Sequence, residues 1–188
     1  MSNPTALVVL AEGAEEMETV ITVDVLRRGG IDVTVAGLDG PDVVKCSRGV
    51  FLKPDIDLDS VASKTYDIVI CPGGMGGATA LAASPKMKTI LSEQQKSDRF
   101  VAAICAGPLA FHSHDIALNK KVTSHPAVKA DMEKDKKFTY CDERVVRDEK
   151  VITSQGPGTC FEFSLAIVEA LQGKEKADSI IPPMLLKL

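Results

Sequence analysis

The stretch FVAAICAGPLAFHS, residues 100–113, passes within a few positions from an apolar run to small residues and then to a helical pattern. With Arg99 it gives the run RFVAAIC (99–105), whose lack of alternation is typical of a strand buried on both faces of a parallel sheet. Ala-Gly-Pro follows Cys105 directly, and small residues permit a sharp turn. The stretch therefore predicts a strand, a tight turn at Cys105 and a helix.

Similar short apolar runs recur along the chain and alternate with longer segments of helical periodicity. We predict strands over 5–11, 32–37, 66–74, 99–105, 121–124 and 150–154, and helices over 16–30, 85–97 and 159–173. Residues 46–58 break the alternation and predict a hairpin or an excursion at the sheet edge. The pattern predicts one domain, 1–188, of the α/β class, doubly wound around a mainly parallel sheet.

Two of the predicted helices carry recognisable end signals. Gly29-Gly30 ends the first, which has apolar residues at helical spacing. Thr159 and Glu162 give the last helix the spacing of a capping box. The final segment, ADSIIPPMLLKL (177–188), is too apolar to stay exposed, so we expect it to pack on its own domain or to help cover a site.

The composition excludes several classes of function. The net charge is −4 and Lys and Arg are not clustered, so we expect no nucleic-acid or membrane binding. The five cysteines are odd in number and irregularly spaced, which argues against a zinc cage, and no metal is expected. The apolar run ALVVLA (6–11) is too short for a membrane span and does not resemble a signal peptide. We therefore expect a reducing, intracellular location.

Chemically active residues gather where the predicted strands end. In a doubly wound fold, ligands bind outside the carboxyl ends of the strands. The segments at those ends are AEGAEEME (11–18), CPGGMGG (71–77), ICAGP (104–108) and TSHP (123–126).

Cys105 has the surroundings of a nucleophile at a strained turn. Its neighbours in AICAG (103–107) are small, as a nucleophile elbow requires, and the amino end of a following helix favours the thiolate. The alternative is that Cys105 fills the core, because free cysteine is among the most buried residue types.

Glu15, Glu16 and Glu18 cluster at the start of the first predicted helix. Complementarity with the helix dipole explains acidic residues there without any function. Glu15 and Glu18, however, share a helix face, and a carboxyl drawn into an apolar site stays protonated near neutral pH and can move a proton.

Two further motifs allow both a functional and a structural explanation. Residues 71–78 are rich in glycine but have neither the G-K-[ST] ending of a phosphate loop nor the G-x-G-x-x-G motif of dinucleotide binding. They therefore form either an oxyanion hole of backbone amides or only a tight turn. His125 is placed to orient a thiol or to exchange its proton. His112 and His114 lie two apart and do not face each other on a helix, so a metal site there is not expected.

These motifs occur together and in order: LAEGAEEMETVI (10–21), VDVLRRGG (23–30), KCSR (45–48), PGG (72–74), TSHP (123–126) and GPGTCFEF (156–163). On them the chain resembles, over essentially its whole length, the parkinsonism-associated deglycases, glutathione-independent glyoxalases of the ThiJ/PfpI superfamily. The resemblance implies a flavodoxin-like α/β/α sandwich that needs no cofactor. It also implies a homodimer with sites near the subunit interface.

The resemblance also implies roles for individual residues. Catalytic positions fall on Cys105, Glu18 and His125, and oxyanion or substrate-binding positions on Gly73, Gly74, Ala106, Glu15 and Arg48. The chain departs from the pattern at Gln155, where close relatives carry arginine, and at Lys53, where some carry an oxidisable cysteine. Gln155 weakens the case for an anion pocket beside Arg48.

The expected activity is that of a lyase of the D-lactate dehydratase type. It converts methylglyoxal to lactate and glyoxal to glycolate through a hemithioacetal on Cys105, with deglycation of protein or nucleotide as a related activity. The alternative is a cysteine-based sensor of oxidative stress, or a redox-dependent chaperone, with little turnover. A peptidase is disfavoured because Ala106, not histidine, follows the cysteine. The expected location is the cytoplasm, with nucleus or mitochondrion as further compartments.

Overall fold

A seven-stranded sheet forms the centre of the computed structural model, which describes residues 2–187. Its order is β10-β11-β7-β6-β1-β2-β5. The strands are β1 (Thr5–Leu10), β2 (Asp32–Gly37), β5 (Ile56–Asp57), β6 (Ile68–Cys71), β7 (Phe100–Ile104), β10 (Val145–Asp148) and β11 (Val151–Ser154). Neighbouring strands are parallel except β10 and β11, which pair antiparallel. The predicted mainly parallel sheet is confirmed.

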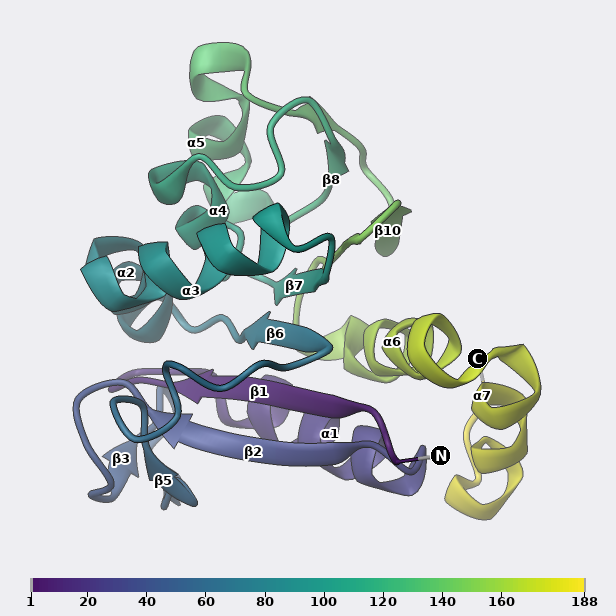
Figure 1. Ribbon diagram of the computed structural model, residues 1–188. Helices are drawn as coiled ribbons and strands as arrows, with labels where there is room; N and C mark the ends of the chain where they lie inside the picture. The colour runs from purple at the N-terminus through teal and green to yellow at the C-terminus, as the bar shows by residue number, and fades with distance from the viewer. Residues whose placement is uncertain (1, 188) are drawn as a thin grey trace.

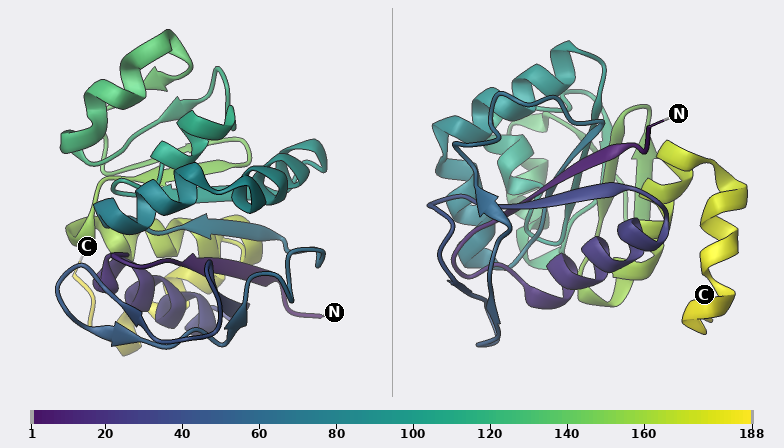
Figure 2. Two further views of the ribbon diagram at one scale, coloured as in Figure 1. Left: turned by 90° about the vertical axis from the view of Figure 1, so that its left-hand side faces the viewer. Right: turned by 60° about the horizontal axis from the view of Figure 1, so that its bottom comes forward.

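Helices cover both faces of this sheet (Figures 1 and 2). One face carries α1 (Glu16–Arg28) and α6 (Cys160–Gln172), and the other carries α2 (Met75–Ala83), α3 (Pro85–Lys96) and α4 (Leu109–His114). Two further α-helices, α5 (Lys129–Glu133) and α7 (Lys174–Ile180), lie outside these layers. The doubly wound α/β arrangement is as predicted.

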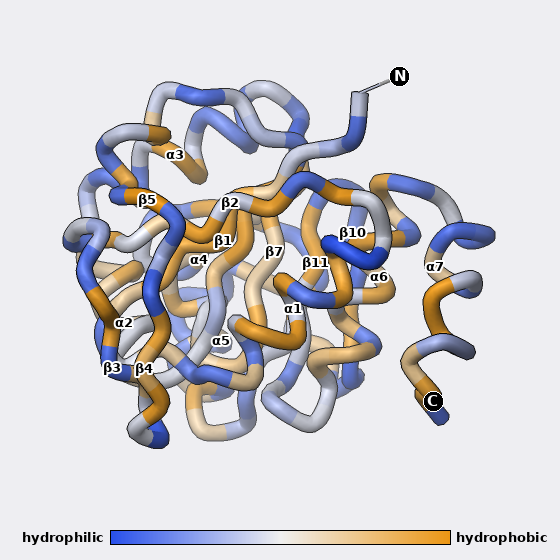
Figure 3. The backbone as a smooth tube through the Cα atoms, turned by 90° about the horizontal axis from the view of Figure 1, so that it is seen from below, coloured by the Kyte–Doolittle hydropathy of each residue, from blue (hydrophilic) through white to orange (hydrophobic). Residues whose placement is uncertain are grey.

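The strands are apolar on both sides because each side has its own core. Along β1, Ala6 and Val8 pack into the cluster beneath α1 and α6, whereas Leu7 and Val9 pack into the cluster beneath α2, α3 and α4. The residues of these strands are correspondingly hydrophobic in the middle of the molecule (Figure 3). Side chains of alternate residues point to opposite faces of a strand, so a strand between two helical layers must be apolar throughout.

Two small sheets lie beside the central one. β3 (Val44–Lys45) and β4 (Phe51–Leu52) form an antiparallel hairpin, and β5 follows as the edge strand of the central sheet. The hairpin begins at Val44, before the predicted segment, and residues 46–58 contribute its turn, its second strand and the edge strand β5. The strand predicted over 121–124 is shorter than expected: β8 (Lys121–Val122) pairs with β9 (Thr139–Tyr140) and does not join the central sheet.

The helix ends follow the predicted signals in one case and not in the other. Gly29 is the C-cap of α1, and Gly30 follows with a positive φ of 74°. Thr159 does not form a capping box with Glu162. The Thr159 hydroxyl instead hydrogen-bonds Gly156 and the Ser154 hydroxyl, and Glu162 pairs with Arg144. Both side chains are satisfied by tertiary partners that spacing alone does not show.

The C-terminal segment packs on its own domain, as predicted. Ile181, Met184 and Leu186 contact the apolar cluster that includes α6. α7 lies near Gly30, beside the end of the sheet where the strands begin (Figure 1). The described part of this segment therefore does not cover the carboxyl ends of the strands, and Leu188 lies outside the described residues. Within residues 2–187, no helix has the length and apolarity of a membrane span.

Candidate active site

Three neighbouring strands bring the predicted residues together. β7, β6 and β1 are adjacent in the sheet and parallel, so the turns that follow them meet at one edge. The turn after β7 carries Cys105, the turn after β6 carries Gly73 and Gly74, and the turn after β1 leads into α1 with Glu15 and Glu18. The site is therefore assembled from segments that are far apart in sequence.

Cys105 occupies a strained turn. Its φ is 63°, which is uncommon for a residue with a side chain, and such strain concentrates at functional positions. The Cys105 N–H donates to the Ser154 carbonyl at 2.9 Å, and its carbonyl accepts the His125 N–H at 2.8 Å. Gly107 is required nearby, because a Cβ there would collide with the Cys71 carbonyl. The half-buried side chain has the placement of a nucleophile elbow.

Glu18 is buried directly behind this turn. Its Oε2 accepts the Gly73 N–H at 2.7 Å, and its own N–H donates to Glu15 Oε2 at 2.8 Å. Oε1 is buried without a well-oriented hydrogen-bond partner among residues 2–187. Burial raises the pKa of the Glu18 carboxyl from 4.5 to about 7, against the opposing effect of hydrogen bonds from Cys105 and the Gly73 amide. The Glu18 carboxyl therefore titrates near neutral pH.

Gly73 lies beside Cys105 and Glu18, and its lack of a side chain lets these two residues come into contact. A Cβ on Gly73 would lie 2.5 Å from Cys105 Cβ and 2.5 Å from Glu18 Oε2. Any larger residue would push the thiol and the carboxyl apart. The Gly73 amide binds the carboxylate, whereas the amides of Gly74 and Ala106 act on the sulfur and lower the pKa of the thiol. The Gly73 amide is therefore already occupied by the Glu18 carboxylate.

The ionisation of Cys105 differs from the sequence-based prediction. Burial, and after it the negative charge of Glu18, raises the pKa of the thiol to about 12, although the Gly74 and Ala106 amides act in the opposite direction. The helix expected to favour the thiolate begins only at Leu109 and has six residues. The thiol consequently needs a base when it reacts, and the carboxylate beside it is Glu18.

A cavity of about 440 Å³ opens above the sulfur. Its lining includes Cys105, Gly74, Ala106, His125, Glu15 and Arg48, with Ser47 and Pro157 as residues that the sequence analysis did not single out. Gly73 and Glu18 lie beneath this lining. The His125 Nδ1 accepts the Ala127 N–H at 3.1 Å, so the neutral ring carries its proton on Nε2.

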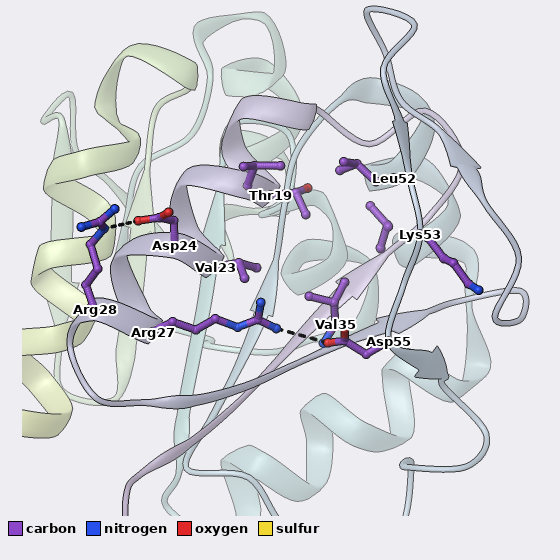
Figure 4. A pocket seen from close by; sticks show the side chains of 11 residues that line it. Thr19, Val23, Asp24, Arg27, Arg28, Val35, Leu52, Lys53 and Asp55 are labelled. Atoms are coloured by element: carbon purple, nitrogen blue, oxygen red, sulfur yellow. Dashed lines mark hydrogen bonds and ion pairs between the residues drawn. The ribbon is translucent and has the colours of Figure 1, made fainter. Parts of the chain in front are cut away.

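The two positions that depart from the family pattern lie outside this lining. The Gln155 side chain donates to Asp142 at 2.9 Å. Lys53 borders a second cavity of about 590 Å³ between α1, β2 and the hairpin (Figure 4). That cavity has an apolar floor and the ion pairs Arg27–Asp55 and Asp24–Arg28 at its edge, but its lining includes no nucleophilic cysteine.

Residues 2–187 contain no cluster of three or more His, Cys, Asp or Glu side chains that could hold a metal ion. The chemistry that these residues themselves supply is a thiol, a buried carboxyl and two backbone amides around one cavity. Such a site can add sulfur to an electrophilic carbon and move protons nearby. The fold and the site thus define an α/β protein with a cysteine at a nucleophile elbow.

Comparison with known proteins identifies the family of the chain. The model of the DJ-1/PfpI family matches residues 4–170. "Parkinson disease protein 7 homolog" of Danio rerio is 50% identical over 188 residues, the full length of both chains. "Glutathione-independent glyoxalase DJR-1.2" of Caenorhabditis elegans is 45% identical over 98% of both. The crystal structure of Drosophila melanogaster DJ-1beta has a TM-score of 0.96 and 45% identity, and the match covers 99% of this chain and 100% of that one. The chain belongs to the DJ-1/PfpI family.

Proposed function

We propose that the protein is a cofactor-independent glyoxalase that converts methylglyoxal to lactate and glyoxal to glycolate. The observation that carries the proposal is the pairing of Cys105 with a buried carboxyl whose pKa lies at about 7, below a cavity that admits a small dicarbonyl. The relative named as a glutathione-independent glyoxalase supports it. The preferred dicarbonyl and the deglycation of protein or nucleotide belong to the same proposal.

The first step is addition of sulfur to the aldehyde carbon. The Glu18 carboxylate takes the thiol proton as the carbon–sulfur bond forms, because the pKa of Cys105 is too high for the free thiolate to dominate. The amides of Gly74 and Ala106 stabilise the alkoxide, an effect worth about 2.7–4 kcal/mol per donor in known enzymes. Transfer of the Glu18 proton to that oxygen gives a neutral hemithioacetal and restores the carboxylate.

The second step moves a hydrogen between the two carbons. Glu18 removes the proton from the former aldehyde carbon, and the resulting enediol receives a proton at the neighbouring carbon, which yields a thioester of the hydroxy acid. Water then cleaves the thioester, so the hydroxy acid leaves and the thiol is regenerated. His125 takes part as a hydrogen-bond donor through Nε2–H to a substrate oxygen, because Nδ1 already accepts the Ala127 amide.

The test measures lactate from methylglyoxal without glutathione in the native protein and in Cys105→Ser. We expect turnover by the native protein and none by the variant. Glu18→Gln is expected to lose turnover while its thiol still reacts with an alkylating reagent. Equal lactate formation by the native protein and Cys105→Ser would remove the proposal.

The second candidate is an oxidative-stress sensor or redox-dependent chaperone. It is favoured by the half-buried position of the Cys105 thiol, since peroxide can reach it, and by the protonated Glu18, which could donate a hydrogen bond to a sulfinate. Glu18→Gln separates the two functions. A sensor without turnover forms no lactate before or after the substitution and changes only its rate of oxidation.

We also propose that the protein acts as a homodimer. Met17 and Val20 of α1 and Val50 and Phe51 of the hairpin are between 47% and 65% exposed, which is unusual for large apolar side chains. A second copy would cover these residues beside the cavity. Light scattering after size exclusion should give twice the mass of the chain, and Phe51→Asp should lower that mass if this face forms the interface.

A further inference from the structure

Glu16 is a buried carboxylate that no step of the proposed reaction uses. It is 7% exposed at the first position of α1. Its two oxygens accept the Ser47 hydroxyl at 3.1 Å, the Arg48 N–H at 2.9 and 3.1 Å and the Val50 N–H at 3.4 Å. Although burial acts to raise it, these hydrogen bonds hold the pKa of Glu16 below its ordinary value. The side chain is therefore an anion bound by the tip of the hairpin.

The base of the hairpin is held by other contacts. The Gly13 N–H donates to the Lys45 carbonyl at 2.9 Å, and the Ser47 N–H donates to the Ala14 carbonyl at 2.8 Å. Beyond Ser47, among residues 2–187, the bonds that tie the hairpin tip to α1 are those to the Glu16 carboxylate. Glu16 therefore fixes residues 48–50 relative to the helix that also carries Glu18.

This tip carries a cation at the substrate cavity. Ser47 and Arg48 line the cavity, and Arg48 is the one Lys or Arg side chain in its described lining. Arg48 is exposed and forms no side-chain ion pair within residues 2–187. Within one chain its charge is therefore not neutralised by a carboxylate side chain, and it acts at the cavity provided that the hairpin tip stays in place.

We propose that Glu16 is a positioning residue of this site: its carboxylate holds the hairpin tip so that Arg48 stays at the mouth of the cavity, where the guanidinium attracts negative charge on incoming molecules. The inference rests on the proposed function only in taking this cavity as the one that substrates enter. It assigns Glu16 a role that differs from those of the adjacent acidic residues, Glu15 and Glu18.

The test compares alkylation of Cys105 by iodoacetate, an anion, and by iodoacetamide, its neutral analogue, with the modified residue identified by peptide mass spectrometry. The ratio of the two rates reports the charge at the cavity. A unit charge about 7 Å from the reagent in a water-like dielectric changes that ratio about threefold. Arg48→Ala should lower the ratio by about this factor.

Glu16→Asp is the decisive variant because it keeps the negative charge and shortens the side chain by one methylene. We expect the iodoacetate preference to fall about threefold, as in Arg48→Ala. Glu16→Gln removes the charge but keeps the shape and one acceptor oxygen, so its ratio should equal or exceed that of the native protein. If Glu16 acted only through its charge, Glu16→Asp would keep the native ratio and only Glu16→Gln would change it, by raising it.

The double variant with Glu16→Asp and Arg48→Ala tests whether Glu16 acts through the position of Arg48 or through a general disturbance of the site. In the Arg48→Ala background, Glu16→Asp should cause no further change in the ratio. A native ratio in Glu16→Asp, or an equal decrease with and without Arg48, would overturn the proposal. Because alkylation requires no turnover, these outcomes stand apart from the lactate assay, whose failure would concern the proposed function alone.

Discussion

Glu18→Gln should make the protein more stable at alkaline pH, although the substitution lies at the centre of the site. In the native protein, folding places the carboxyl where its pKa is about 7 instead of 4.5. The folded state therefore holds the Glu18 proton more tightly than the unfolded state does. Below about pH 4 Glu18 is protonated in both states, and its burial costs no stability. As the pH rises, the free energy of unfolding falls, until Glu18 is ionised in both states above about pH 7.

The magnitude follows from the size of this shift. At about 1.36 kcal/mol per pKa unit, a rise from 4.5 to about 7 corresponds to about 3 kcal/mol of lost stability at alkaline pH. Glutamine is neutral at every pH and its carbonyl can still accept the Gly73 N–H. Relative to the native protein, Glu18→Gln should gain about 3 kcal/mol between about pH 4 and pH 8, or about 6–12 °C in melting temperature for a chain of this length.

The measurement is a pair of urea or thermal unfolding curves at about pH 4 and about pH 8, under reducing conditions that keep Cys105 unmodified. Glu93→Gln, an exposed helical position, is the matched control and should show no comparable dependence on pH. A stability difference between native protein and Glu18→Gln that is the same at both pH values would refute the reasoning. In that case Glu18→Gln would lose as much stability between pH 4 and pH 8 as the native protein does.

Further predictions concern the same site and its support. Turnover by the native protein should rise with pH through about 7 as Glu18 ionises, which initial rates across this range would show, and a flat profile would be the contrary result. Gly74→Ala should cost at least about 2 kcal/mol in denaturant unfolding, because φ is 78° and a Cβ would meet the backbone of residues 13–15; unchanged stability would contradict this. Phe163→Ala should cost about 3–5 kcal/mol by the same assay, since the ring is fully buried. Gln155→Ala should leave the KM for methylglyoxal within about twofold, because its side chain faces Asp142 and not the cavity; a larger change would place it in the substrate path.

Much of the fold follows from patterns within short segments. Continuous apolar runs predicted the central parallel strands, and the distance between them left room for the helices of a doubly wound sheet. Segments without such a pattern were missed. α2 begins in the glycine-rich sequence MGGATALAA, and β10 is a partly exposed edge strand of four residues. The glycines at the start of α2 and the short length of β10 weaken the local pattern, so these two elements are recognised from their packing against neighbours.

The candidate site, like the fold, has features that the sequence predicted and features that it did not. Small residues around Cys105 predicted its turn, and the acidic cluster after β1 marked the first turn of α1 as a candidate for proton transfer. Sequence did not distinguish the three glutamates of that cluster. In the structure Glu15 caps the helix, Glu16 binds the hairpin tip and Glu18 lies buried beneath the thiol.

The amino-acid sequence by itself therefore determined the alternation of strands and helices and the residue types available at each strand end, because both depend on neighbours along the chain. Only the tertiary structure decided which of those residues meet and which of them carry charge. The pKa of Glu18 and the pKa of Cys105 both rise because residues distant in sequence exclude water from them. Desolvation depends on everything that packs around a group, and no local pattern records it.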